Sequence, residues 1–228
     1  MRFGIVVFPG TWSDTDCYHA VAGVLQQDAQ YLWHQESTIN DVDCLILPGG
    51  FSYGDYLRSG CIASKSRIIN DIIKHAKNGG LILGICNGFQ ILIETGLLKG
   101  SLLRNKKLRF ISKNVFLKVT NIQNHFCKDY KKKNIIKLPI AHNEGNYFAS
   151  SELLKNLEDN NLIAFKYCNK KGEVNIDSNP NGSSNNIAGI FSKEKNILGM
   201  MPHPERLIDP ILSGEDGSIM FESLLKSH

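Results

Sequence analysis

A cysteine stands at a turn between two apolar segments, in the run Gly84-Ile85-Cys86-Asn87-Gly88. The apolar residues 81–85 predict a short strand, and residues 89–94 have a helical pattern. Enzymes with the G-x-S-x-G motif place a nucleophilic serine on the same kind of strand–turn–helix elbow. At the start of a helix, oriented N–H groups also favour a thiolate. The pattern therefore predicts a nucleophilic cysteine; the alternative is a buried cysteine at a strand end, a common place for this residue type.

A histidine and a glutamate lie two residues apart in a second run, Pro202-His203-Pro204-Glu205, which follows an apolar segment. The flanking prolines favour extended backbone, in which residues i and i+2 point the same way. The Glu205 carboxylate would then accept a hydrogen bond from the His203 ring and orient it as a base. With Cys86 as nucleophile, these residue types predict a Cys–His–Glu triad. A surface pair on a proline turn is the alternative.

Two adjacent glycines, Gly49 and Gly50, follow the apolar residues 43–47. Parallel α/β sheets bind ligands at the carboxyl ends of their strands, where these glycines and Cys86 would both lie. We expect the N–H groups of Gly50 and Asn87 to stabilise an oxyanion, and one such donor is worth roughly a hundredfold to a thousandfold in rate. The alternative for the glycine pair is a simple turn.

The elements that must position these residues follow from the apolar pattern. Up to residue 100, strands alternate with helices, which predicts a flavodoxin-like, doubly wound and mostly parallel sheet with helices on both faces. Beyond Gly100 this alternation ends, and additional antiparallel strands are expected in the C-terminal half. The expected strands are 3–8, 30–33, 43–47, 81–85, 115–119, 135–140, 162–167, 187–191 and 197–201, and the expected helices are 14–27, 62–76, 89–94 and 217–225. Residues 175–186 should form a loop, and we expect a single domain over residues 1–228.

The composition is ordinary for a globular protein, with 228 residues, 42% hydrophobic and 21% charged residues and a net charge of +4. The six cysteines contain no CxxC pair, which indicates reduced thiols in the cytoplasm and no metal site. The basic run 128–137 is expected to be a solvated loop, since no nucleic-acid-binding signature accompanies it. No apolar run has the length of a membrane span, so we expect neither membrane nor nucleic acid as a partner.

Several longer blocks carry a family resemblance. The elbow and the His203–Glu205 run resemble the class I (triad) glutamine amidotransferases. Within that class, the sequence is most similar to the glutaminase subunits of phosphoribosylformylglycinamidine synthases, which act in purine biosynthesis. The blocks that carry this finer resemblance are residues 48–58, 138–145, 179–183 and 200–206.

The resemblance implies a mechanism and partners. Cys86 would attack the side-chain amide of glutamine, and His203 would protonate the departing ammonia and then activate water. Gln90, one helical turn beyond Cys86, would contact the glutamine substrate, or else be a helix-surface residue. The ammonia would pass to a large ATP-dependent synthetase subunit, and in the family a small third subunit often bridges the two. No cofactor is expected in this chain, because it lacks nucleotide-binding glycine motifs; ATP and magnesium would bind the partner.

The chain departs from the family pattern in two places. It has Thr11-Trp12-Ser13-Asp14 where the family usually has Ser-Asn-Cys-Asp, and Asn143 where a glycine is frequent. His142 and Glu144 lie in a family block, but the residues themselves indicate no role.

Two other functions are compatible with parts of the sequence. A cysteine peptidase-like α/β protein would also carry an elbow cysteine, although such proteins do not usually have histidine and glutamate two residues apart after a late strand. A catalytically silent docking subunit would need no intact triad. The run from Pro202 to Glu205 argues against both.

Overall fold

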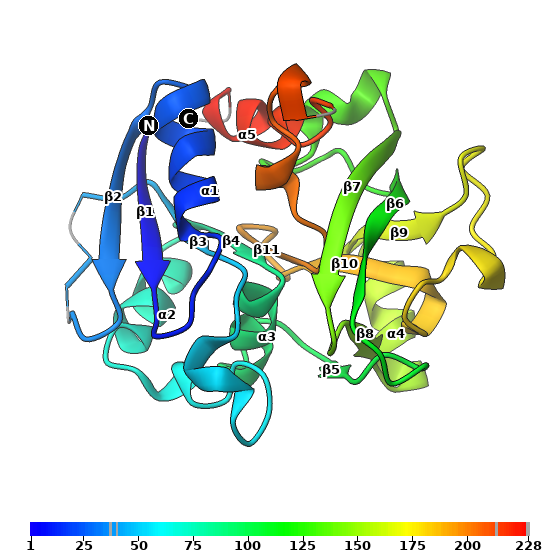
Figure 1. Ribbon diagram of the computed structural model, residues 1–228, viewed down its shortest axis with the longest axis horizontal. Helices are drawn as coiled ribbons and strands as arrows, with labels where there is room; N and C mark the ends of the chain where they lie inside the picture. The colour runs from blue at the N-terminus through cyan, green and yellow to red at the C-terminus, as the bar shows by residue number, and fades with distance from the viewer. Residues whose placement is uncertain (37, 40, 213, 227–228) are drawn as a thin grey trace.

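The computed structural model describes residues 1–36, 38–39, 41–212 and 214–226 (Figure 1). The strands of its large sheet are β1 (Arg2–Val7), β2 (Asp28–Trp33), β3 (Cys44–Leu47), β4 (Leu81–Ile85), β6 (Ile111–Val119), β7 (Ile135–His142), β9 (Ile163–Cys168), β10 (Ile187–Phe191) and β11 (Ile197–Met200). These nine strands, all within the described residues, have the order β2-β1-β3-β4-β11-β10-β9-β6-β7. A separate antiparallel pair consists of β5 (Ser101–Leu103) and β8 (Asn146–Phe148).

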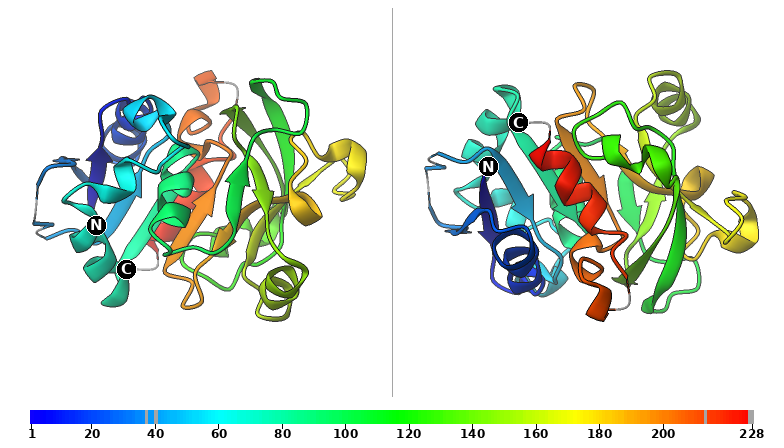
Figure 2. Two further views of the ribbon diagram at one scale, coloured as in Figure 1. Left: turned by 90° about the horizontal axis from the view of Figure 1, so that it is seen from below. Right: turned by 90° about the horizontal axis from the view of Figure 1, so that it is seen from above.

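Parallel pairing runs from β2 to β11 and forms one half of the sheet. All four residues of β3 are buried, as expected of a parallel strand covered on both faces. The helices α1 (Asp14–Tyr18) and α5 (Ser218–Leu225) lie on one face, and α2 (Ile69–Lys77) and α3 (Asn87–Glu94) lie on the other (Figures 1 and 2). This half confirms the doubly wound arrangement that the sequence predicts.

Antiparallel pairing joins the remaining strands, which confirms the additional antiparallel strands expected in the C-terminal half. Although β7 is the last strand in the order, the backbone N–H of His203 donates a hydrogen bond to the Pro139 carbonyl at 2.9 Å. The sheet therefore curls, and β7 returns toward the carboxyl end of β11. This curl closes one side of the rim at which the candidate residues lie.

Two predicted helices are wrong in their bounds. Residues 14–27 do not form one α-helix, because α1 ends at Tyr18 and a π-helical turn, His19–Val24, follows it. The helix expected over residues 62–76 begins only at Ile69. Ser66, with φ −65° and ψ 154°, is extended and separates this helix from a short 3-10 turn at Ala63–Lys65.

The apolar pattern also misses β5, β8 and the helix α4 (Ser151–Asp159). Ser150 caps α4, since its hydroxyl oxygen accepts a hydrogen bond from the Leu153 N–H at 3.2 Å. The capping serine followed by leucines at 153, 154 and 157 was a readable helix signal.

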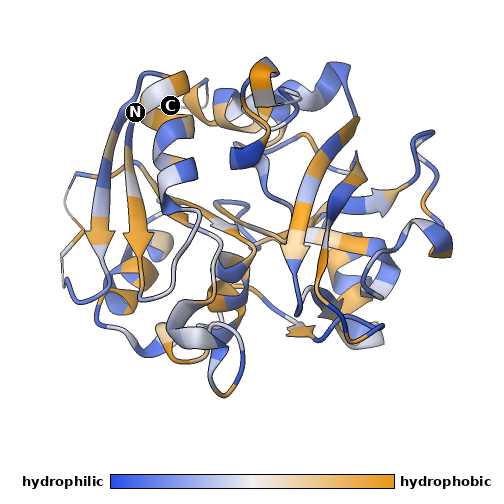
Figure 3. Cartoon of the chain, in the orientation of Figure 1, coloured by the Kyte–Doolittle hydropathy of each residue, from blue (hydrophilic) through white to orange (hydrophobic). Residues whose placement is uncertain are grey.

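Apolar residues gather in the strands at the middle of the molecule (Figure 3). One cluster of buried side chains includes Leu45 from β3 and Ile140 from β7, so the two halves share a core. Because both halves pack into this core, the loops at the carboxyl ends of β3, β4 and β11 hold fixed positions relative to β7. Within the described residues, no helix has the length and apolar character needed to cross a membrane.

Candidate active site

Cys86 occupies the turn between β4 and α3, as the sequence predicts. Its backbone has φ +50° and ψ −102°, a region that side-chain-bearing residues rarely adopt and that costs on the order of 1–3 kcal/mol. A Cβ on Gly88 would overlap the Leu47 carbonyl, so the close approach of α3 to β3 requires glycine there. The Cys86 N–H donates to the Met200 carbonyl at 2.7 Å and ties the turn to β11. The strained elbow thus lifts the thiol above the sheet edge.

The pairing of β4 with β11 explains why His203 lies near Cys86. The two strands are parallel, with Ile85 opposite Met200, so the residues that follow them leave the sheet at the same end. A Cβ placed on Gly49 would lie 2.7 Å from His203 Cε1 and 3.4 Å from Cys86 Cβ. The Cys86 Cβ and the His203 ring therefore both lie against Gly49.

His203 and Glu205 form a buried pair, with Nδ1 and Oε1 2.6 Å apart. The expected extended segment is wrong beyond His203, because Pro204–Arg206 form a 3-10 turn that brings the carboxylate to the ring. Burial works against a charge on His203, but Glu205 and the Cys86 sulfur outweigh it and raise the pKa of His203 to about 9. The imidazolium is therefore the main form near neutral pH.

The thiol points toward β7 in this structure. Cys86 Sγ lies 3.7 Å from the Ala141 carbonyl oxygen, a weak contact. His203 Nε2 is buried and has no hydrogen-bond partner among the described residues. Catalytic hydrogen bonds are often long in ligand-free enzymes. Rotation about the Cα–Cβ bond of Cys86 is the simplest movement that would exchange the Ala141 contact for one with the imidazole.

The backbone N–H of Gly50 belongs to the loop after β3, and that of Asn87 belongs to the first residue of α3, next to Cys86. Thr11 and Gly50 form an isolated antiparallel bridge whose hydrogen bonds use the N–H groups of other residues. In such a pair the Gly50 N–H points away from the partner segment. The Asn87 N–H is the first of α3 and has no acceptor within the helix. Both groups are placed to suit the predicted oxyanion site.

The side chains of Asn87 and Gln90 tie the elbow to its neighbours. The Ser52 N–H donates to Asn87 Oδ1 at 3.2 Å, and Asn87 Nδ2 donates to Gln90 Oε1 at 2.9 Å. Gln90 Nε2 in turn donates to the Glu144 carbonyl at 2.7 Å. Gln90 is buried rather than a helix-surface residue. Contact with a glutamine substrate stays a prediction, and it would require Gln90 to exchange one of these bonds.

His142 and Glu144 lie at the end of β7 and in the turn that follows. His142 Nδ1 and Asn105 Oδ1 are 3.0 Å apart, and burial, with a smaller effect of His203, lowers the pKa of His142 to about 4. Ser59 Oγ donates to Glu144 Oε2 at 2.8 Å. His142 is thus a neutral part of the wall, and Glu144 holds the loop that follows Gly50.

Arg206 and Ser13 lie beside the triad, and the sequence alone did not predict their contacts there. Arg206 Nη2 donates to the Oγ of the fully buried Ser13 at 2.9 Å. Arg206 Nε lies 3.6 Å from both Glu205 Oε1 and Asp16 Oδ2. Arg206 directly follows the Pro202–Glu205 run, and Ser13 is one of the departures from the family pattern. Each position was therefore marked in the sequence as a candidate neighbour of the triad. No spacing in the sequence connects them to each other.

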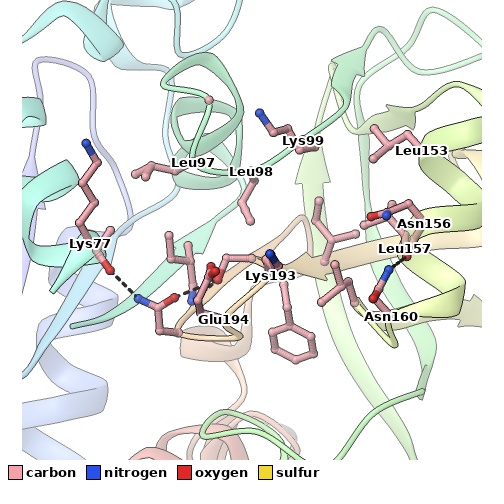
Figure 4. A pocket seen from close by; sticks show the side chains of 18 residues that line it. Lys77, Leu97, Leu98, Lys99, Leu153, Asn156, Leu157, Asn160, Lys193 and Glu194 are labelled. Atoms are coloured by element: carbon pink, nitrogen blue, oxygen red, sulfur yellow. Dashed lines mark hydrogen bonds between the residues drawn. The ribbon is translucent and has the colours of Figure 1, made fainter. Parts of the chain in front are cut away.

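A cleft of about 670 Å³ lies beside the amino end of β11 (Figure 4). Leu97 and Leu98 after α3, Leu153 and Leu157 of α4, and Ile197 at the start of β11 line it. The triad residues follow the carboxyl ends of β4 and β11, whereas this cleft borders the amino end of β11. The cleft therefore takes no part in the chemistry described above.

Thiol nucleophiles on doubly wound sheets occur in several kinds of protein. What separates the amidotransferases from the peptidase-like proteins is a histidine and a glutamate on a turn after a late strand, and that turn is present beside Cys86. Fold and site together define a triad glutamine amidotransferase.

Comparisons with known proteins agree with this class. The family model described as the CobB/CobQ-like glutamine amidotransferase domain matches residues 1–215. The PurQ subunit of phosphoribosylformylglycinamidine synthase from Pelagibacter ubique is 53% identical over 227 residues, which cover 100% of this chain and 99% of the relative. The PurQ subunit from Moorella thermoacetica is 50% identical, with 99% of this chain and 95% of the relative covered.

Solved structures give the same result. PurLQS from Thermotoga maritima matches with a TM-score of 0.86 and 39% identity, over 99% of this chain and 98% of that chain. The glutaminase domain of Trypanosoma brucei CTPS with bound acivicin shares the fold. It matches with a TM-score of 0.60 and 16% identity, over 99% of this chain and 94% of that chain. The chain belongs to the glutamine amidotransferase family, and within it to the PurQ subunits of phosphoribosylformylglycinamidine synthase.

Proposed function

We propose that this chain is the glutaminase subunit of a phosphoribosylformylglycinamidine synthase, with Cys86, His203 and Glu205 as its catalytic triad. Membership of the family supports the reaction, hydrolysis of glutamine to glutamate and ammonia. The observation that supports the residue assignment is that both side chains lie against Gly49, where a Cβ would be 3.4 Å from the Cys86 Cβ and 2.7 Å from His203 Cε1. Cys86 follows β4 and His203 follows β11, and these two strands are adjacent and parallel. Their pairing alone brings the nucleophile and the acid to the same edge of the sheet.

The reaction would proceed in two steps. The Cys86 thiolate attacks the side-chain amide carbon, while the N–H groups of Gly50 and Asn87 stabilise the oxyanion. The imidazolium of His203 protonates the leaving nitrogen, so ammonia departs and a thioester remains. Neutral His203 then takes a proton from water, whose attack on the thioester releases glutamate and restores the thiol.

The ammonia would be used by a separate ATP-dependent synthetase subunit, which converts formylglycinamide ribonucleotide to formylglycinamidine ribonucleotide, with a small subunit bridging the two. The relatives named as subunits and the neighbour PurLQS support an assembly of this kind. This chain has neither a G-x-x-x-x-G-K-[ST] nor a G-x-G-x-x-G motif, so we assign ATP and magnesium to the partner and no cofactor to this chain.

The residue assignment is tested by Cys86→Ala, with Cys61→Ala as a matched control at another free cysteine. Glutamate release from glutamine is measured with the chain alone and with its synthetase partner, and labelling by a thiol-reactive glutamine analogue is located by mass spectrometry. We expect Cys86→Ala to abolish release and labelling, and Cys61→Ala to retain both. Glutamate formation by Cys86→Ala would refute the nucleophile, and an inert, unlabelled wild-type complex would favour a docking role.

A further inference from the structure

Glu205 shares one oxygen between two cations. Its Oε1 lies 2.6 Å from His203 Nδ1 and 3.6 Å from Arg206 Nε. Glu205 is buried, and its other oxygen, Oε2, has no hydrogen-bond partner in the part of the chain that the structure describes. A buried carboxylate that meets both an imidazole and a guanidinium divides its attraction between them.

We propose that Arg206, held in place by Ser13 and Asp16, is a positioning residue that acts through Glu205 to keep His203 acidic enough to protonate the departing ammonia. The inference rests on the proposed function. It concerns the strength of the acid, a property that the identity of the three triad residues does not determine.

The physical argument starts from the buried pair. Beside an isolated carboxylate an imidazolium is strongly stabilised, and an imidazolium that binds its proton too tightly is a poor general acid. A positive charge near the shared oxygen weakens that stabilisation and also keeps Glu205 ionised. The guanidinium is suited to this task, because it stays charged and presents several N–H groups at once.

Arg206 is itself anchored by Ser13, which precedes α1, and by Asp16 within α1. Ser13 Oγ accepts its Nη2–H at 2.9 Å, and Asp16 Oδ2 lies 3.6 Å from its Nε. The N–H of Ser13 donates to the Gly49 carbonyl at 3.1 Å, so the same residue contacts the glycine beside Cys86 and His203. The Ser13 hydroxyl is a good hydrogen-bond acceptor, so it anchors the guanidinium of Arg206.

Several other groups face the pair and are unchanged by substitution of Arg206. They are Asp16 and Cys17 of α1, Cys86 at the elbow and His142 of β7. Asp16 and Cys17 add negative charge or none, and His142 is neutral near pH 7, so Arg206 is the group expected to lower the proton affinity of His203.

The test follows the His203 ring by NMR in protein labelled at histidine Cε1, with the signal assigned by its loss in His203→Asn. In Arg206→Met we expect the titration of His203 to move upward by about one pH unit, because a nearby positive charge is removed. We expect kcat for glutamine to fall about tenfold with KM nearly unchanged, since a weaker general acid slows the chemical step. Glu205→Gln should move the titration in the opposite direction.

Matched variants separate charge from structure. Arg206→Lys keeps the charge and should titrate near wild type with intermediate kcat. Ser13→Ala loosens the anchor, so it should lower kcat about threefold and move the His203 titration upward by less than Arg206→Met does. Arg2→Met is the control, because Arg2 lies 3.6 Å from Asp41 in an exposed pair at the start of β1. If Arg206→Met fails to fold, Arg206→Lys and Ser13→Ala carry the test.

A His203 titration that stays in place or moves downward in Arg206→Met overturns the inference, as does an unchanged kcat. In Arg206→Lys and Ser13→Ala, wild-type kcat in both variants overturns it as well. The His203 titration is measured without turnover, so it is independent of the glutaminase assay. The inference fails if the titration does not shift, even when the wild-type chain releases glutamate. The proposed function fails if the wild-type complex releases no glutamate, even when the titration shifts as expected.

Discussion

His203, in the parallel half of the sheet, and His142, in the antiparallel half, are both buried near the rim and are held in opposite charge states. His203, after β11 of the parallel half, is 1% exposed, and His142, at the end of β7, is 2% exposed. The pKa of His203 is raised to about 9, whereas that of His142 is lowered to about 4. Since burial is the same, it cannot explain the difference.

The partner of each ring explains it. His203 meets the carboxylate of Glu205, while His142 meets the amide oxygen of Asn105. Asn105 Nδ2 already donates to the carbonyls of Arg109 and His142, so its Oδ1 is left to accept from the ring. An amide offers no charge to offset the cost of burying an imidazolium, and a carboxylate does. His203 thus supplies a charged group to the site, whereas His142 is a neutral part of its wall.

The largest effect on kcat is expected when the partner of His203 is changed from a carboxylate to an amide, the kind of partner that His142 has. Glu205→Gln replaces the carboxylate with an amide, so His203 should resemble His142 and be neutral near pH 7. We expect kcat to fall by roughly a thousandfold to ten-thousandfold, the size of effect known when the orienting carboxylate of a serine-protease triad becomes an amide. Steady-state glutamate release measures this. Glu158→Gln, an exposed residue of α4 paired with Lys166, is the control, and a loss below tenfold in Glu205→Gln would contradict the comparison.

A second effect concerns stability as a function of pH. His203 has a folded pKa above its ordinary 6.5, so its contribution is complete below about pH 6.5 and is lost as pH rises toward 9. His142 has a folded pKa below 6.5, so stability is lost as pH falls from about 6.5 toward 4. We expect a maximum of the unfolding free energy near pH 6.5, with losses on the order of a few kcal/mol on either side.

Urea denaturation across this pH range measures the effect. Glu205→Gln should flatten the alkaline side, because it removes the carboxylate that stabilises charged His203. It should also steepen the acid side, because a buried His203 beside an amide would lose stability on protonation as His142 does. His142→Gln should flatten the acid side alone. An acid loss that persists in His142→Gln would show that groups other than His142 cause it.

The elbow and the parallel half could be predicted because their signals are local. Continuous apolar runs mark buried parallel strands, and the residues from Gly84 to Gly88 form the turn on their own. The pairing of β4 with β11 then brings Cys86 and His203 together, which needs only the rule that parallel strands end at one edge.

The rest depends on contacts between distant segments. Asn105 and His142 are 37 positions apart, and Ser13 and Arg206 are 193 apart, with no repeat or motif that relates either pair. The curl that brings Ala141 against Cys86 is a property of the whole antiparallel half. The 3-10 turn at Pro204–Arg206 was missed because flanking prolines favour both extended and turn backbone.

The smallest effects are expected from glycines that lie against each histidine. A Cβ on Gly49 would lie 2.7 Å from His203 Cε1, and a Cβ on Gly145 would overlap the His142 ring. Neither glycine has a positive φ, so alanine changes the space and not the backbone conformation allowed. Gly23 gives a matched control, because a Cβ there would lie 2.6 Å from the Nδ1 of His19, whose exposed side chain can move aside.

We expect Gly49→Ala to lower kcat about tenfold, because a displaced imidazole no longer lines up with the thiol. Gly145→Ala should instead lower the unfolding free energy by about 1–3 kcal/mol, the usual cost of overpacking, and change kcat less than about threefold. Gly23→Ala should leave both quantities near wild type. Glutamate release and urea denaturation of the three variants measure them. An equal loss of kcat in Gly49→Ala and Gly145→Ala would show that His142 takes part in the chemistry, and the division of labour between the two histidines would then be wrong.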